Sequence, residues 1–219
     1  PADAVDVEGL KKYLTGVVAQ QVEQLRPTKT DRINSMLKVI QPALKHRIAL
    51  NLNRGFKYEE RGQDGNVKHV LFGTGSRPRI RGELFLPERE RPASVTVVVH
   101  PDGVAGLVES DGKSAPLVND LVAKGHAVLV IDYFGVGENK NPFHAAAPSA
   151  ISHFTCYNRS TAAERVQDIV ATAVSAKRST PGVQSVNLVG IGSAGPLCLI
   201  ACNRIGDFDT VVIDANQFD

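Results

Sequence analysis

The sequence predicts an α/β fold: a mostly parallel β-sheet with antiparallel strands at its N-terminal side, preceded by a helical extension. Two observations carry this prediction. From residue 95 onward, short β-branched runs alternate with helical patterns, as expected of parallel strands joined by helices. Before residue 55, apolar residues instead recur at the spacing of an amphipathic helix. The chain therefore combines helices at its start with a sheet-forming domain.

The helical extension contains two apolar stripes. The first covers residues 8–25 and is followed by a proline as a stop, and the second covers residues 30–48. Pro42 lies inside the second stripe, so we expect it to kink that helix or to divide it into two. We assign residues 1–54 to the extension and residues 55–219 to the α/β domain.

The α/β domain opens with three β-rich segments separated by turn residues, which predict an antiparallel hairpin or meander. After them, the strand from Val95 to His100 is apolar enough to be buried on both faces. The first three strands are expected at 56–61, 67–72 and 80–86, and the later elements are strand 95–100, helix 116–124, strand 127–132, helix 162–177, strand 186–189, helix 196–203 and strand 210–213.

Composition excludes several classes of protein. The 219 residues are 42% hydrophobic and 22% charged, which is typical of a globular protein and excludes a collagen-like rod, a coiled coil and a disordered tail. The formal net charge is only +2, so we expect neither nucleic acid nor an anionic membrane surface as a partner. No run of about 18 apolar residues and no signal segment is present, so no transmembrane helix is expected.

The cysteines predict no disulfide and no metal site. Cys198 and Cys202 lie four residues apart in an apolar stretch, where one helical face would bury both. We interpret the cysteines, including Cys156, as buried free thiols. No cluster of His, Cys, Asp and Glu has the ligand spacing of zinc, so we expect no metal and no other cofactor.

The most informative segment is a glycine-rich turn that leads from a strand into a helix, Gly190-Ile191-Gly192-Ser193-Ala194-Gly195. With Asp214 at the end of the next strand, it fits a dinucleotide site, where glycines admit the pyrophosphate and the acid binds a ribose hydroxyl. It also fits a nucleophile elbow, which lifts a nucleophile over the sheet above a helix N-terminus. The order of the preceding strands favours the elbow.

From about Phe56 to its end the chain resembles the α/β-hydrolase family, and within it the acetyl xylan esterase and dienelactone hydrolase-like group. The resemblance lies in the elbow, in the loop His100-Pro101-Asp102-Gly103 and in the segment Asp132-Tyr133-Phe134-Gly135-Val136-Gly137. It implies a carboxylic ester hydrolase that forms an acyl-enzyme. The implied catalytic residues are Ser193 and Asp214, and the implied oxyanion and substrate pocket consists of His100, Asp102, Gly103 and Gly192.

The chain departs from the family at the elbow. The family's Gly-x-Ser-x-Gly places the serine two residues after the first glycine, and that position is Gly192, with Ser193 one residue late. The family order of nucleophile, acid and histidine is also incomplete, because all six histidines precede Ser193. The sheet would end about two strands early, so we expect the C-terminal strands of the fold to be missing.

Each candidate residue also has a purely structural interpretation. His100 could simply be a hydrogen-bonded residue at a strand end, and Asp102-Gly103 an ordinary turn. Asp132 is expected to brace the glycine turn that follows it through local hydrogen bonds. Asp214 could cap the glycine-rich turn. Residues 141–155 form either a lid or a solvated connection.

The sequence supports three functional hypotheses. The first is a carboxylic ester hydrolase acting on a small-molecule or carbohydrate ester, secreted or periplasmic if the substrate is a polysaccharide. The second is a non-catalytic hydrolase-like module of a larger or tandem protein, completed by a further C-terminal domain or partner chain. The third is an NAD(P)-binding domain that uses Gly190, Gly192 and Gly195.

Overall fold

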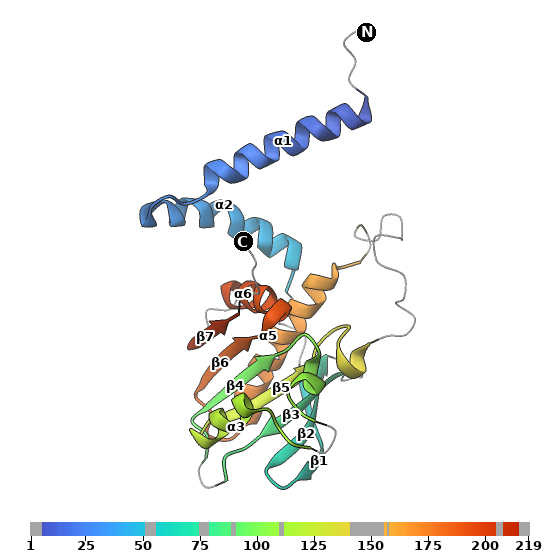
Figure 1. Ribbon diagram of the computed structural model, residues 1–219, viewed down its shortest axis with the longest axis vertical. Helices are drawn as coiled ribbons and strands as arrows, with labels where there is room; N and C mark the ends of the chain where they lie inside the picture. Colours follow the sequence, from blue (N-terminus) through green and yellow to red (C-terminus); the bar gives the residue numbers. More distant parts are fainter. Residues whose placement is uncertain are drawn as a thin grey trace. The chain divides into compact units, whose positions relative to one another are not determined.

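The computed structural model describes residues 6–50, 56–74, 79–88, 91–109, 112–140, 156, 158–204 and 208–214 (Figure 1). Its internal contacts divide the chain into two compact units, Pro1–Arg47 and Ile48–Asp219. Ile48 is only 3% exposed, which makes it part of the core of the second unit. The boundary therefore falls earlier in the chain than the end of the helical extension assigned from the sequence.

The first unit consists of two helices, α1 (Val7–Leu25) and most of α2 (Thr30–Ile48). Asp6 caps α1, because its carboxylate accepts a hydrogen bond of 2.7 Å from the backbone N–H of Gly9. The expected division at Pro42 is wrong, since α2 continues through this residue as a single helix.

The second unit is built on a seven-stranded sheet with the order β1-β2-β3-β5-β4-β6-β7. The strands β1 to β3 and β5 pair antiparallel along the sheet, whereas β5, β4, β6 and β7 run parallel. This arrangement confirms the predicted mostly parallel sheet with antiparallel N-terminal strands. The bounds are β1 Phe56–Asp64, β2 Val67–Thr74, β3 Ile80–Phe85, β4 Ser94–Val99, β5 Ala127–Asp132, β6 Ser185–Gly190 and β7 Thr210–Ile213.

Helices cover both faces of the sheet (Figure 1). The helix α3 packs with the short helix η1 against one face, around a cluster that contains Val98, Val128 and Val130. The long helix α5 and the helix α6 contact each other and the sheet on the other face. Their bounds are η1 Gly103–Gly106, α3 Pro116–Ala123, η2 Gly137–Asn139, α5 Thr161–Ser179, η5 Gly192–Ala194 and α6 Gly195–Arg204.

The parallel strands determine where a site can form. Every residue of β5 is buried, as are five of the six residues of β4, which confirms that these apolar runs form the centre of the sheet. The carboxyl ends of β4, β5, β6 and β7 meet at one edge, where open α/β sheets bind ligands. This edge carries His100, Asp132, the glycine-rich turn and Asp214.

Candidate active site

Gly192 occupies the position of the turn that needs a left-handed backbone. It lies two residues after the end of β6, starts η5 and has φ +53°. A Cβ atom placed on it would lie 3.3 Å from Cγ of Pro101, so the loop after β4 lies against the turn. A nucleophile elbow holds its nucleophile in such a strained conformation, and glycine adopts it without strain. The left-handed position of this glycine-rich turn therefore carries no side chain.

The other two glycines of the motif are required by close packing of α6. A Cβ atom on Gly190 would lie 2.8 Å from both Cβ and Sγ of Cys198. A Cβ atom on Gly195 would lie 1.9 Å from the carbonyl oxygen of Asp214. Real Cβ atoms essentially never come this close to another atom, so packing of α6 against the ends of β6 and β7 accounts for both glycines without a ligand.

Ser193 lies in η5 with an exposed side chain. Neither its hydroxyl nor its backbone N–H has a hydrogen-bond partner among the described residues. In the described part of the chain, no histidine or carboxylate is therefore bonded to the hydroxyl to take its proton. A serine without such a base is a weak nucleophile.

Asp214 holds the glycine-rich turn at both ends. Its carboxylate Oδ2 accepts a hydrogen bond of 3.0 Å from the backbone N–H of Gly192. Its own backbone N–H donates to the carbonyl of Gly190 at 2.9 Å. The carboxylate thus caps the turn at the amide to which a bound anion would otherwise be attracted.

The loop after β4 uses its backbone N–H groups internally. The N–H of Asp102 donates to Nδ1 of His100 at 3.1 Å, and the N–H of Gly103 donates to the carbonyl of His100 at 2.9 Å. Because Nδ1 accepts a hydrogen bond, the neutral His100 ring carries its proton on Nε2. The two amides that the resemblance implies as oxyanion donors are thus already engaged, and an oxyanion would compete with His100 for them.

Asp132 joins the two loops at this edge through a buried carboxylate. Its Oδ1 accepts from the N–H of Val104 at 2.8 Å, and its Oδ2 accepts from the N–H of Glu138 at 3.1 Å. A Cβ atom on Gly103 or Gly137, both with positive φ, would lie 2.1 Å from Oδ1. The expected bracing role of Asp132 is confirmed, and it extends to η1, which the sequence did not indicate.

A second buried carboxylate, that of Asp168, holds the segment after β5 from the face of the sheet that carries α5. Asp168 on α5 receives two hydrogen bonds from Arg79, of 2.9 and 2.6 Å. Burial nevertheless raises the pKa of the Asp168 carboxyl to about 6, because desolvation outweighs the attraction of Arg79. Arg165, also on α5, donates to the carbonyl of Phe134 at 3.1 Å. Sequence analysis missed this network, since its partners come from three separate segments.

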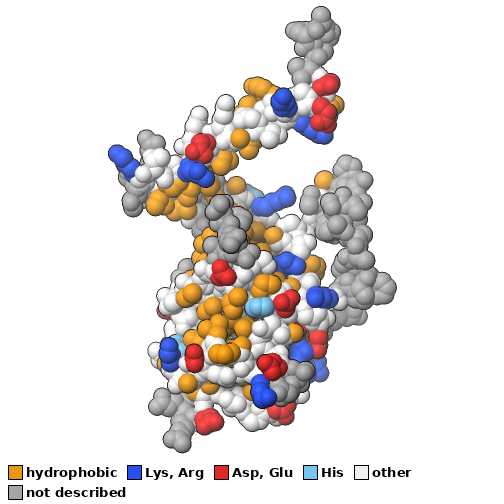
Figure 2. Space-filling view, viewed as in Figure 1, with side chains coloured by type: hydrophobic (Ala, Val, Ile, Leu, Met, Phe, Trp, Pro, Cys, Tyr) orange, Lys and Arg blue, Asp and Glu red, His pale blue; other side chains and the backbone are white. Residues whose placement is uncertain are grey.

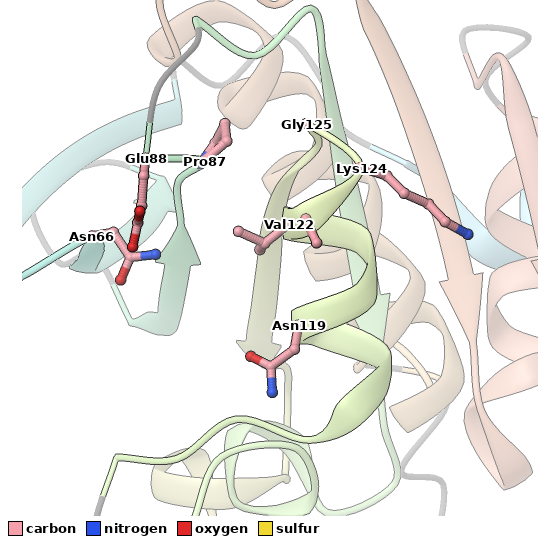
Figure 3. A pocket seen from close by; sticks show the side chains of 8 residues that line it. Asn66, Pro87, Glu88, Asn119, Val122, Lys124 and Gly125 are labelled. Atoms are coloured by element: carbon pink, nitrogen blue, oxygen red, sulfur yellow. The ribbon is translucent and has the colours of Figure 1, made fainter.

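The described residues contain two notable pockets, and neither was predicted. One, which we call the β2–β3 pocket, has a volume of about 790 Å³ and lies between these strands and the segments of η1 and η2. The other, of about 640 Å³, lies at the opposite end of the sheet, between the C-terminal end of α3 and the chain after β3. Figure 3 shows Asn66 and Glu88 on one side of this second pocket and Val122 and Asn119 on the other.

The part of the chain that the structure describes contains neither a metal-binding cluster nor a membrane-spanning helix. Among the described residues, no group of three or more His, Cys, Asp or Glu could hold a metal ion. Within that part of the chain, no helix is both long and apolar enough to cross a membrane. The three cysteines are free, but only Cys198 is buried: Cys156 is exposed and Cys202 is half-buried. The lid or connection expected at 141–155 lies outside the described residues.

Comparison with known proteins identifies the fold. No protein-family model matches the chain, and no curated protein matches its sequence. A Bacteroides fragilis structure assigned as an acetyl xylan esterase matches 95% of this chain and 61% of its own, with a TM-score of 0.65 and 11% identity. The chain has the α/β-hydrolase fold and spans about three fifths of the length of that protein.

Two further structures match over shorter parts of the chain. Acetyl xylan esterase 1 from Thermoanaerobacterium sp. matches 78% of this chain and 55% of its own, with a TM-score of 0.48 and 15% identity. An α/β serine hydrolase without a lid from Xanthomonas campestris matches 72% and 66%, with a TM-score of 0.45 and 16% identity.

Proposed function

We propose that this chain is the core of a protein of the carboxylic ester hydrolase type that does not form an acyl-enzyme. Its elbow instead binds a ligand or shapes a ligand site. The observation that carries the proposal is the left-handed conformation of Gly192. It marks the nucleophile position of the elbow, and glycine supplies no nucleophile there. The fold shared with the Bacteroides fragilis structure supports the hydrolase type, and an ester-bearing small molecule or carbohydrate is the proposed ligand.

The contacts of the other candidate residues support the same proposal. Asp214 is engaged by the amide of Gly192, and the loop amides are engaged by His100. Ser193 has no base among the described residues. In a working triad the acid is hydrogen-bonded to the base, and the base to the nucleophile. The contacts of Asp214 and His100 instead stabilise the turn and the loop in which they lie.

An ester-hydrolysis assay tests the proposal. We expect the purified protein and its Ser193→Ala variant to release acetate from acetylated xylan, and nitrophenol from p-nitrophenyl acetate, at the same rate as a Ser179→Ala control. Ser179 is the last residue of α5 and lies on a different element from Ser193. The rate of the Ser179→Ala variant therefore gives the rate of hydrolysis that does not depend on Ser193. A rate in the unmodified protein that falls in the Ser193→Ala variant alone would refute the proposal.

Hydrolysis through Ser193 is the second candidate function. It is favoured by the exposed hydroxyl of Ser193 and by its unpartnered N–H among the described residues, next to the N-terminal end of α6. In that mechanism Oγ of Ser193 attacks the ester carbonyl, the alcohol leaves, and water releases the acid from the acyl-enzyme. The same assay decides between the two functions.

We do not extend the proposal to NAD(P). The carboxylate of Asp214 lies on the amide of Gly192, which places a negative charge where a pyrophosphate would bind. Close packing of α6 already accounts for Gly190 and Gly195.

We also propose that a further strand, from the same protein or from a partner chain, covers β7. The four residues of β7 are Thr210-Val211-Val212-Ile213, apolar on both faces like the central strands. Among the strands that the structure describes, β7 nevertheless lies last in the sheet, and Val212 is 56% exposed. Edge strands normally carry charges or proline instead.

A further inference from the structure

We propose that the β2–β3 pocket binds an organic carboxylate with an apolar body, through the side chains of His69 and Arg81. This pocket is lined by residues of β2, β3, η1 and η2 and by none of the residues of the glycine-rich turn. The proposal is therefore independent of the proposed function of the elbow.

A single buried carboxylate holds the two cationic side chains next to each other. The side chain of Glu83 is 4% exposed, and its Oε2 lies 2.6 Å from Nδ1 of His69. Its Oε1 accepts a hydrogen bond of 2.9 Å from Nη2 of Arg81. His69 and Glu83 are opposite each other in the β2–β3 register, so the sheet fixes this geometry. Both oxygens of Glu83 are thereby used, and the remaining donors of His69 and Arg81 are directed elsewhere.

Nε2 of His69 and a second nitrogen of Arg81 are paired with exposed acids. Nε2 of His69 lies 3.0 Å from Oδ2 of Asp64, whose side chain is 88% exposed. Nη1 of Arg81 donates to Oε1 of Glu138, whose side chain is 69% exposed. Exposed ion pairs contribute little to stability, because water screens them and long side chains lose entropy in forming them. Asp64 and Glu138 thus mark the positions that the carboxylate of a ligand would take.

The rest of the pocket matches the body of such a ligand. Its wall includes the apolar side chains of Val67, Phe85, Val104 and Val108, and its volume is about 790 Å³. Small-molecule sites combine an apolar lining with a few fixed polar groups in this way. The carboxylates of Glu109 and Asp132 also line the pocket; Glu109 is exposed, and both oxygens of Asp132 accept backbone N–H groups. The donors that a ligand carboxylate would take are therefore Nε2 of His69 and the N–H groups of Arg81 that do not bond Glu83, and it would replace Asp64 and Glu138 there.

Removing one of the exposed acids tests the proposal. Benzoate is the probe, and its dissociation constant is measured by isothermal titration calorimetry with the unmodified chain and with Glu138→Gln. The glutamine no longer competes as an anion for Arg81, so we expect benzoate to bind about 1.5- to 5-fold more tightly, the range of an exposed ion pair. Arg81→Gln is expected to weaken binding about tenfold, because it removes a charge-assisted hydrogen bond.

Glu60→Gln is the matched control. Glu60 lies on β1 and pairs with Lys68, so its replacement removes the same charge without touching the pocket. Benzoate affinity should not change in this variant. The proposal is overturned if benzoate fails to bind, if Glu138→Gln weakens its binding, or if benzamidine binds in its place and loses affinity in Glu138→Gln. All three readouts measure binding only, so they stand apart from the hydrolysis assay of Ser193.

Discussion

Individual residues of the two candidate sites differ in how clearly their sequence context indicates their role. Gly192 and Asp132 stand in recognisable local motifs, and the structure places both at the carboxyl ends of parallel strands. His69 and Glu83 stand in no motif, because they meet only through the register of β2 and β3. Pairs that depend on register need the strand alignment first, and one unaligned sequence does not provide it.

His69 provides a prediction at this scale. The hydrogen bond with Asp64 raises its pKa most, the charge of Glu83 also raises it, and burial opposes both. A raised pKa in the folded state means that the protonated ring stabilises the fold fully below about pH 6.5, and that this stabilisation is lost as the pH rises through the folded pKa. Asp64→Asn removes the largest contribution, so the titration midpoint of His69 should fall.

The midpoint is measured from the pH dependence of the imidazole proton shifts in the NMR spectrum. Asp120→Asn is the control, since Asp120 lies exposed on α3 and does not contact His69. An unchanged midpoint in Asp64→Asn would contradict the prediction.

Among the elements, the strands and helices of the second unit follow from apolar patterns, whereas the connections between them do not. The predicted strands and helices all occur, with ends that differ by a few residues. The clamp of Asp132 on Val104 and Glu138 is different, because it joins η1 and η2 across the sheet edge. Short 3₁₀ turns have no apolar period, so composition alone gives little sign of them.

Gly103 tests this clamp. Alanine there meets two costs: a left-handed backbone at φ +67°, and a Cβ atom 2.1 Å from Oδ1 of Asp132. Gly65 is the matched control, with φ +58° and no atom within 4 Å of its added Cβ. We expect Gly103→Ala to lower the free energy of unfolding by about 1–3 kcal/mol more than Gly65→Ala, the cost of an unsatisfied buried polar group. Urea unfolding curves measure both; equal losses would show that Asp132 adjusts freely.

For the whole molecule, the α/β architecture can be predicted from the alternation of β-branched runs and helical patterns in the sequence. The apolar surface that the molecule exposes cannot be predicted in this way. Val189 and Val212 are neighbours in the β6–β7 register, and Val189 packs on the face that carries α3. Figure 2 shows hydrophobic side chains gathered on this side of the second unit, over the region where Figure 1 places β4 and β6. An apolar face next to an uncovered edge strand favours association between chains.

Val212→Lys is therefore expected to reduce self-association of the chain, because a lysine on an edge strand opposes pairing with another strand. Light scattering over a concentration series measures the effect as a lower average mass at the same concentration. Gln184→Lys adds the same charge at an exposed position before β6 and serves as the control. If both variants associate like the unmodified chain, β7 is not the surface involved.

The position of β4 between β5 and β6 has a consequence for biosynthesis. Thr96 of β4 contacts Asn187 of β6, which follows 91 residues later in the chain. A ribosome releases the N-terminal part first, so β4 leaves it well before this neighbour has been made. Pairing across such a separation is also slow, because a long loop must close before the contact forms. We expect one side of Ser94–Val99 to stay unpaired until translation reaches β6, whereas β5, its other neighbour, is made much earlier.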